Sequence, residues 1–320
     1  MKTTIPLILI LIFSCSDKAE NITLEKQVEE TVKSPTWEEQ YEEWVKNPEQ
    51  YGGLETLKKI KGVRENNSSE LELSNTNISD LTPLAGLVNL EILYLFGTNI
   101  SDLTPLAGLV GLKSLRLSDI NSSDLTPLAG LVGLKRLGIS GKNISDLSPL
   151  GGLVGLYDLS LSDDKISDLS PLAGLVKLDE LTLCRNNISD LSPLAKLVGL
   201  KKLYLVDTNI SDLTPLAGLV KLEILNLFGN KISDLSPLAG LVKLEKLTLN
   251  RNNISDLSHL QGLVGLKRLH LDPKLDSQKD ELFKIIEKAK VEKAKTSAPR
   301  PPPRISSSTT LPSRTIPQRK

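Results

Sequence analysis

A segment of twelve residues, Asn77 to Val88, returns with small changes every 22 residues. No copy is longer or shorter than its neighbours. A fixed period of roughly 20 to 50 residues is typical of a solenoid, in which each unit buries its apolar edge against the next one. The repeat therefore overrides the two domains that a chain of 320 residues would otherwise suggest. Its centre, Asp-Leu-Ser/Thr-Pro-Leu, starts at Asp80, Asp102, Asp124, Asp146, Asp168, Asp190, Asp212 and Asp234, and a ninth copy at Asp256 has His259 in place of Pro.

The apolar residues of one unit predict a coil that turns a corner every three residues. Their spacing is three, except between Leu93 and Leu95, where a spacing of two predicts a short strand. The Thr82-Pro83 pair predicts one short 3₁₀ turn, with Thr82 as its cap and Pro83 as its first residue. The apolar positions of this unit are Ile78, Leu81, Leu84, Leu87, Leu90, Leu93 and Leu95.

The same positions carry a family resemblance. The pattern Leu90-x-x-Leu93-x-Leu95-x-x-Thr98-x-Ile100 is similar to the leucine-rich repeat. The following Asp-Leu-Thr-Pro-Leu-Ala-Gly-Leu-Val segment resembles the 22-residue internalin-type bacterial subclass. The resemblance implies an α/β solenoid over residues 67–272, a right-handed curved array with about ten strands. A parallel sheet would line its concave face and short 3₁₀ turns its convex side.

The array departs from the family at the position where an asparagine ladder stacks. Thr and Asp can still satisfy buried backbone groups there, whereas Ile120 and Lys142 cannot, so we expect looser packing around residues 118–145. Asn occupies this position at Asn186, Asn230 and Asn252, and Thr76, Thr98, Ile120, Lys142, Asp164 or Thr208 replaces it elsewhere.

Residues 35–66 are expected to form an N-terminal helical cap. Trp37, Tyr41, Trp44 and Val45 fall on one stripe of a helix, with Ser34-Pro35 as cap and first helical residue. Leu54, Leu57 and Ile60 are expected to continue this cap. The stripe could serve a partner, but open ends of solenoids need covering, which favours a cap.

Residues 273–295 are expected to form a C-terminal cap helix. Ser277 with Asp280 resembles a capping box in front of Leu282 and Phe283. Residues 296–320 contain Pro, Ser, Thr and Arg without acidic residues, which predicts a disordered tail.

The N-terminus resembles an export signal. Lys2 precedes the apolar run 5–13, which is too short for a permanent membrane span. Ile12-Phe13-Ser14-Cys15 resembles a bacterial lipobox, which implies a signal peptide over 1–14 and lipid attachment at Cys15. Residues 15–34 then form an acidic linker, and Ser16 favours the outer membrane or cell surface. An ordinary signal peptide with an unmodified Cys15 is the alternative.

The sequence offers no catalytic constellation. His259, His270 and Cys184 lie without partners at ligand or catalytic spacing, so we expect no enzyme, no metal and no cofactor. The repeated Asp residues are expected to accept backbone N–H bonds, a calcium ladder being the alternative. A net charge of zero gives no bias toward nucleic acid.

Comparison of the copies shows which positions were free to diverge. The Leu and Asp positions scarcely change, whereas the outward positions of each strand change freely. Exposed rings and aliphatic side chains gather among these positions and predict an interface on the concave face. The predicted contact residues are Ile92, Tyr94, Phe96, Arg116, Arg136, Tyr204, Val206, Ile224 and Phe228.

The predicted function is therefore binding of a macromolecule by a monomeric, exported lipoprotein. A protein is favoured over a glycan because aromatic side chains are few and unevenly spaced. Two alternatives remain. The array could be a structural or self-associating surface spacer. If the N-terminus is not an export signal, it could be an intracellular regulator of an enzyme.

Overall fold

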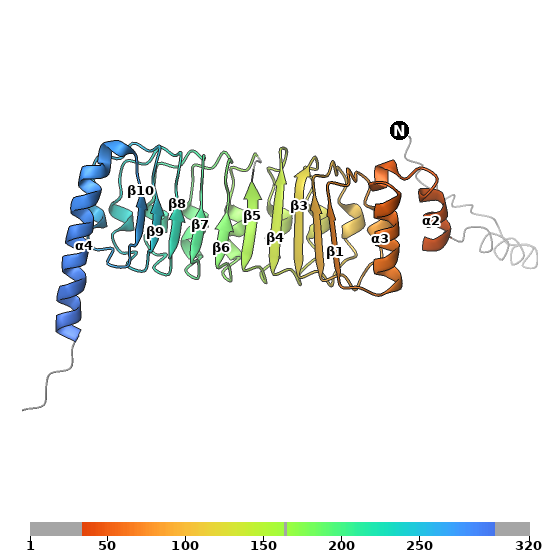
Figure 1. Cartoon of the computed structure of the whole chain (residues 1–320), viewed down its shortest axis with the longest axis horizontal. Coiled ribbons are helices and arrows are strands. Elements are labelled where there is room, and N and C mark those ends of the chain that lie inside the picture. Colours follow the sequence, from red (N-terminus) through yellow and green to blue (C-terminus); the bar gives the residue numbers. More distant parts are fainter. Residues whose placement is uncertain (1–33, 163–164, 298–320) are drawn as a thin grey trace, which may run out of the picture.

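The computed structural model describes residues 34–162 and 165–297 as one curved solenoid. Its single sheet has ten parallel strands that pair in chain order, so each repeat adds one strand beside the previous one (Figure 1). This confirms the predicted leucine-rich-repeat fold. The strands are β1 (Glu70–Ser74), β2 (Ile92–Phe96), β3 (Ser114–Ile120), β4 (Arg136–Gly141), β5 (Asp158–Ser162), β6 (Glu180–Thr182), β7 (Lys202–Tyr204), β8 (Ile224–Asn226), β9 (Lys246–Thr248) and β10 (Arg268–His270).

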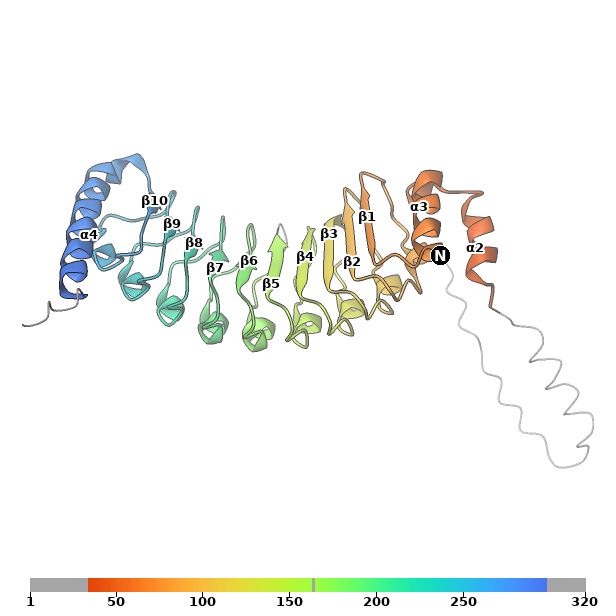
Figure 2. The ribbon, with the colours of Figure 1, turned by 60° about the horizontal axis from the view of Figure 1, so that its bottom comes forward.

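A short 3₁₀ turn lies opposite each strand, on the outer side of the arc (Figure 2). In the first of these turns the prediction of Thr82 as the N-cap was wrong by one residue. Leu81 is the N-cap, and Thr82 already lies in the turn. The cap hydrogen bond comes instead from Asp80, whose Oδ1 accepts the Thr82 N–H at 2.8 Å. The turns in the array are η2 (Thr82–Leu84), η3 (Thr104–Leu106), η4 (Thr126–Leu128), η5 (Ser148–Leu150), η6 (Ser170–Gly174), η7 (Ser192–Lys196), η8 (Thr214–Leu216), η9 (Ser236–Leu238) and η10 (Ser258–Leu260).

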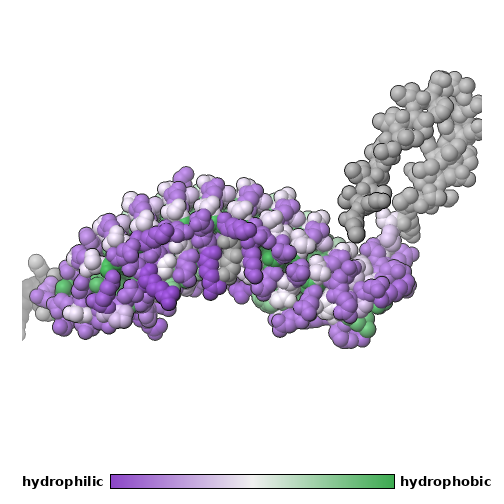
Figure 3. All heavy atoms as spheres, turned by 90° about the horizontal axis from the view of Figure 1, so that it is seen from above, coloured by the Kyte–Doolittle hydropathy of each residue, from purple (hydrophilic) through white to green (hydrophobic). Residues whose placement is uncertain are grey.

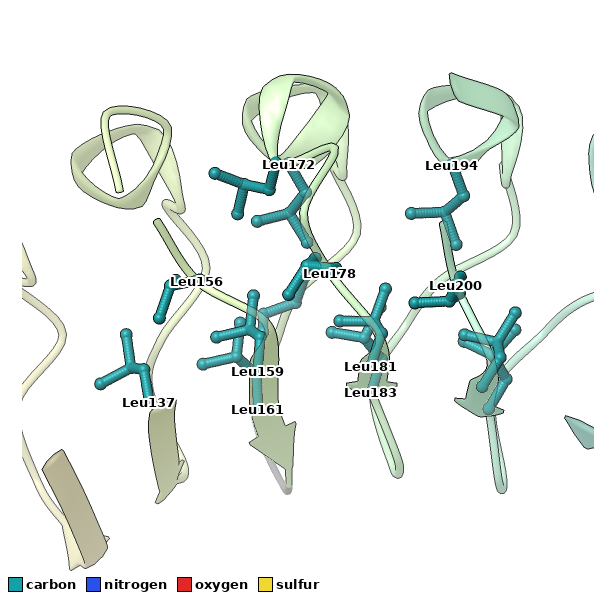
Figure 4. Close-up of a cluster of buried hydrophobic side chains, with 14 of the residues drawn as sticks. Leu137, Leu156, Leu159, Leu161, Leu172, Leu178, Leu181, Leu183, Leu194 and Leu200 are labelled. Atoms are coloured by element: carbon teal, nitrogen blue, oxygen red, sulfur yellow. The ribbon is translucent and has the colours of Figure 1, made fainter. Parts of the chain in front are cut away.

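The core is a continuous column of leucine and isoleucine between the sheet and the turns. Equivalent leucines of successive repeats stack on one another, as Leu137, Leu159 and Leu181 do in Figure 4. Each fully buried side chain of this kind contributes about 1.5–3 kcal/mol relative to an exposed one. The fixed period thus places the same side chain against its own copy at every step.

The asparagine ladder forms where the sequence supplies it. Asn230 donates through Nδ2 to the carbonyls of Leu205 (2.7 Å) and Leu227 (3.0 Å) and accepts the Ile210 N–H (3.1 Å). Asn252 makes the corresponding three bonds. Asn186 makes two of them and donates its third bond to the Cys184 carbonyl.

Two of the substituted ladder positions show what replaces asparagine. Thr98 compensates by donating through Oγ1 to the Ser118 carbonyl. Ile120 is 2% exposed and pairs with Gly141 across a register shift. A hollow of about 560 Å³ borders this pair and is lined by residues 119–121 and 140–142, within the stretch where the sequence predicts looser packing.

Two helices cover the N-terminal end of the array, within residues 35–66, where the sequence predicts a helical cap. Helix α2 (Trp37–Trp44) begins after Thr36, which forms a capping box with Glu39, so the Ser34-Pro35 start was wrong by two residues. A 3₁₀ turn, η1 (Glu49–Tyr51), separates it from α3 (Leu54–Glu65). Leu57 and Ile60 are buried on α3, and Ile60 joins the core of the array.

Helix α4 (Asp276–Ser297) covers the other end, preceded by the 3₁₀ turn η11 (Pro273–Leu275). Ser277 therefore lies inside the first turn of α4, and the predicted capping box there was wrong. Leu282 and Ile286 join the core.

Some of the sequence predictions fall on parts of the chain that the structure does not describe. The signal peptide 1–14, Cys15, almost all of the linker 15–34 and the tail beyond residue 297 lie outside the described residues. No helix among residues 34–162 and 165–297 has the length and apolar character needed to cross a membrane.

Candidate functional site

The concave face is built by the alternation of side chains along each strand. The two leucines of a strand point into the core, and the residues beside them point outward, half-buried between neighbouring strands. The parallel register places equivalent outward residues side by side, for example Tyr94 beside Arg116 and Arg136 beside Asp158. A row of outward residues therefore crosses the sheet from repeat to repeat.

The first predicted group lies over β2 and β3. The rings of Tyr94 and Phe96 lie 6.0 Å apart, and the Tyr94 hydroxyl lies 3.2 Å from the Ser114 Oγ. Arg116 places its guanidinium carbon 5.6 Å from the centre of the Tyr94 ring. Ile92 is half-buried on the same strand, so the structure brings these four predicted contact residues together. They form a small apolar patch with a cation at its inner edge.

The middle of the face, over β4 to β6, is polar. Arg136 lies over the ring of Tyr157, at 5.3 Å. A hollow of about 330 Å³ lies on Gly138 and is bordered by both arginines and by Asp158 and Glu180.

The acidic side of this hollow is only partly neutralised. Burial raises the pKa of Asp158, and the neighbouring Glu180 raises it further, while the two arginines and Lys202 oppose the shift. Glu180 itself accepts from Lys202 at 2.9 Å, and this bond raises the pKa of Lys202. Asp158 is therefore the carboxylate of this group that lacks an ion pair within 4 Å among the described residues.

The second predicted apolar group lies over β7 and β8. Tyr204 and Ile224 are half-buried on the strands, whereas Val206 and Phe228 lie just beyond the strand ends. Burial raises the pKa of the Tyr204 hydroxyl. Arg251 places its guanidinium carbon 5.1 Å from the centre of the Phe228 ring.

The nine predicted contact residues thus form two groups with a polar middle between them. Seen from above, small hydrophobic areas lie near the concave edge on both sides of a hydrophilic centre (Figure 3). The sequence placed Gly138, Asp158, Glu180 and Lys202 at outward positions of this face, but the prediction did not count them among the contact residues. The signal for a polar middle was their register, which the repeat already implied and which places Arg136, Asp158, Glu180 and Lys202 side by side.

The repeated Asp residues serve the backbone. Each of the nine accepts the N–H two residues later at 2.8 Å, as predicted. Hydrogen bonds from Thr214, through its hydroxyl and its N–H, lower the pKa of Asp212, and equivalent bonds act on Asp124, Asp146, Asp168, Asp190, Asp234 and Asp256. Within the described part of the chain, no group of three His, Cys, Asp or Glu residues is placed to hold a metal ion.

Known proteins share this architecture. The family model described as "Leucine Rich repeats (2 copies)" matches residues 69–108, 176–218, 198–240 and 220–262. The solved structure of the internalin InlF of Listeria monocytogenes is 31% identical over 69% of this chain and 74% of that protein, with a TM-score of 0.57. This chain belongs to the internalin-type leucine-rich-repeat proteins. A second internalin of that organism, InlC2, is 35% identical over 63% of this chain and 80% of its own, with a TM-score of 0.51.

The internalin-type scaffold is typical of non-enzymatic protein–protein interaction. The ectodomain of the Arabidopsis thaliana receptor kinase GASSHO1/SCHENGEN3, solved in complex with CASPARIAN STRIP INTEGRITY FACTOR 2, is 25% identical, with a TM-score of 0.55. The match covers 64% of this internalin-type chain and 27% of the receptor chain. A search of the curated proteins gave no match.

Proposed function

We propose that this internalin-type chain is an exported, lipid-anchored protein that binds a protein partner along its concave face. The observation that carries the proposal is the pair of half-buried apolar groups, Tyr94 with Phe96 and Tyr204 with Phe228, on a sheet whose other outward residues are mostly polar. Exposed rings of this kind reduce solubility and are the residues in which binding energy concentrates at interfaces.

The size of the face suits a protein. Ten strands at about 4.8 Å each give a ledge of roughly 45 Å, which exceeds the width of a standard protein interface of about 800 Å² per partner. The family supports this function, because its scaffold commonly presents a concave sheet to other macromolecules. Fold alone does not name the partner.

The binding proposal is tested by photo-crosslinking on intact cells that express the protein, followed by identification of the attached molecule. Replacement of Tyr94, Phe96, Tyr204 and Phe228 by Ala should remove the crosslinked product. A matched control replaces Val132 and Val220, which are exposed outside the sheet face, by Ala. Equal crosslinking by both variants would overturn the concave-face proposal.

The anchor proposal rests on the sequence Ile12-Phe13-Ser14-Cys15 after a short apolar run. Metabolic labelling with a palmitate analogue should mark the wild-type protein and a Cys184→Ser variant, but not a Cys15→Ser variant. Cys184 is the suitable control because it is a half-buried cysteine within the array, far along the chain from the lipobox. Labelling of the Cys15→Ser protein at the wild-type level would refute the anchor.

A second candidate function is that of a self-associating surface spacer. One observation favours it: eight equivalent valines, one per repeat from Val88 to Val242, are 47–65% exposed. Sedimentation velocity separates the candidates. A spacer would form oligomers that a Val110→Lys/Val132→Lys/Val154→Lys variant abolishes, whereas the protein-binding proposal expects a monomer.

A further inference from the structure

The middle of the concave face contains one strand residue without a side chain. Gly138 lies on β4 between Arg116 and Ser160, its partners in the neighbouring strands. A Cβ atom on Gly138 would lie 3.3 Å from the Cγ of Arg116, so the arginine stem already leans over the glycine. The absence of a side chain at Gly138 keeps the hollow of about 330 Å³ open.

Two guanidinium groups border this hollow and are held by aromatic rings. Arg116 lies over Tyr94 and Arg136 over Tyr157, an arrangement in which the ring face attracts the cation. Among the described residues, neither guanidinium makes a hydrogen bond, or an ion pair within 4 Å. Each therefore retains its in-plane N–H donors, which suit a carboxylate approaching along the edge of the group.

The acidic border of the hollow does not consume these donors. Arg136 and Asp158 are register partners, yet no ion pair forms between them. The pKa of Asp158 is raised, with burial as the largest cause, so the arginines do not fully compensate the burial of this carboxylate. Glu180 is engaged by Lys202. The hollow thus has a cationic side with free donors and an anionic side that is partly neutralised within the fold.

We infer that the hollow above Gly138 receives one acidic side chain, Asp or Glu, of the protein that the concave face binds, with its carboxylate between Arg116 and Arg136. This inference rests on the proposed function. The side chain of Phe96 at the rim would cover the hydrocarbon part of the incoming residue. A charge-assisted Arg–carboxylate contact of this kind fixes the register of a partner as well as adding affinity.

The anionic side of the hollow argues for a protein segment rather than a polyanion. A nucleic acid or a phosphate-rich polymer would bring several negative charges, and some would meet Asp158 and Glu180. Like charges at such short range cost affinity. A protein segment can carry one carboxylate for the arginines and neutral or basic residues beside it.

A random peptide library displayed on phage tests the inference with a defined probe. Peptides selected on the wild-type protein are sequenced and then measured against two variants, R116Q/R136Q and Gly138→Val. Valine favours a strand, so Gly138→Val fills the hollow while preserving β4. Matched controls are Arg268→Gln and Thr248→Val, which introduce the same residues at outward positions of β10 and β9, outside the hollow.

The expected result is enrichment of Asp or Glu at one position of the selected peptides. Their affinity should fall about tenfold or more for R116Q/R136Q and for Gly138→Val, and stay within about twofold for the controls. Circular dichroism establishes that each variant is folded.

The outcomes separate this inference from the proposed function. Peptides without an acidic preference, whose binding depends on Tyr94 and Phe228 but not on the arginines, would overturn the acidic-residue inference and leave the concave-face proposal standing. Peptides whose binding depends on none of these residues would overturn both.

Discussion

Replacement of Asn230 by Ala is a direct test of what holds successive repeats together. The Asn230 side chain is buried and bonds to five groups, one of which is the Phe228 carbonyl, 3.3 Å from Nδ2. Its Nδ2 donates to the carbonyls of Leu205 and Leu227, at 2.7 and 3.0 Å, and its Oδ1 accepts from the Ile210 N–H and the Thr208 hydroxyl, at 3.1 and 2.5 Å. Alanine would remove all of these bonds from the interior of the array.

The expected cost follows from the groups left without a partner. The Ile210 N–H and the Leu205 carbonyl are buried between repeats, and each unsatisfied group costs about 1–3 kcal/mol. We therefore expect Asn230→Ala to lower the free energy of unfolding by about 3 kcal/mol. The control is Asn187→Ala, because Asn187 is exposed and its side chain accepts only from Asn209, at 2.8 Å. A surface change of that kind costs less than about 0.5 kcal/mol.

Urea denaturation followed by circular dichroism gives the global effect, and amide hydrogen exchange locates it. Stability in a solenoid is a sum of repeats and their nearest-neighbour interfaces, so the loss should concentrate around Ile210 and Asn230. An exchange rate at Ile210 that rises equally in the two variants would refute the ladder argument. So would an equal loss of unfolding free energy.

Two further predictions concern the turns and the end of the array. Hydrogen bonds to Asp212 and its equivalents lower their pKa in the folded state, so this contribution to stability is present above the unfolded value, near 3.8, and is lost as the pH falls through the lower folded pKa values. The urea midpoint should drop below pH 4, and an Asp190→Asn/Asp212→Asn variant should show a shallower drop; an unchanged slope would contradict this origin. At the C-terminal end, Ile286→Asp should unfold α4 from the array and promote aggregation, because Ile286 is 0% exposed, whereas Val291→Asp, at a 52% exposed position of the same helix, should do neither. Light scattering and circular dichroism measure both effects.

The array could be predicted from the sequence because one period fixes every repeat at once. The spacing of Leu93 and Leu95 located a strand and its inward face, and the copies located the other strands. Successive leucines bury against their own equivalents, so no long-range information beyond the period was needed.

The ends of the array were harder to predict because their local signals competed. Ser34 and Thr36 both precede Trp37 as candidate caps, and only Thr36 makes two reciprocal hydrogen bonds, with Glu39. The break between α2 and α3 follows from Pro48 and from Gly52, which has a φ of +82°. Helix α4 starts before Ser277 because η11 leads into it directly.

The candidate site could be predicted only as a set of outward positions. The sequence identified Arg116 and Arg136 but not the direction of their side chains. That direction depends on rings from neighbouring repeats, Tyr94 and Tyr157, and on the space left by Gly138. Such contacts join residues about one repeat apart, and propensity and periodicity do not encode them.

The distribution of charge across the sheet restricts the kind of partner that can use the whole face. Between the apolar group on β2 and the one on β8 lie six strand spacings, or roughly 29 Å, and the residues in the middle of that interval form the row Arg136, Asp158, Glu180 and Lys202. A partner that buried only apolar surface would desolvate this row and leave Arg136 and Asp158 without an ion-pair partner, which is costly. A small ligand would reach only one apolar group. The face therefore suits a protein surface that is apolar at two separated places and carries complementary charges between them.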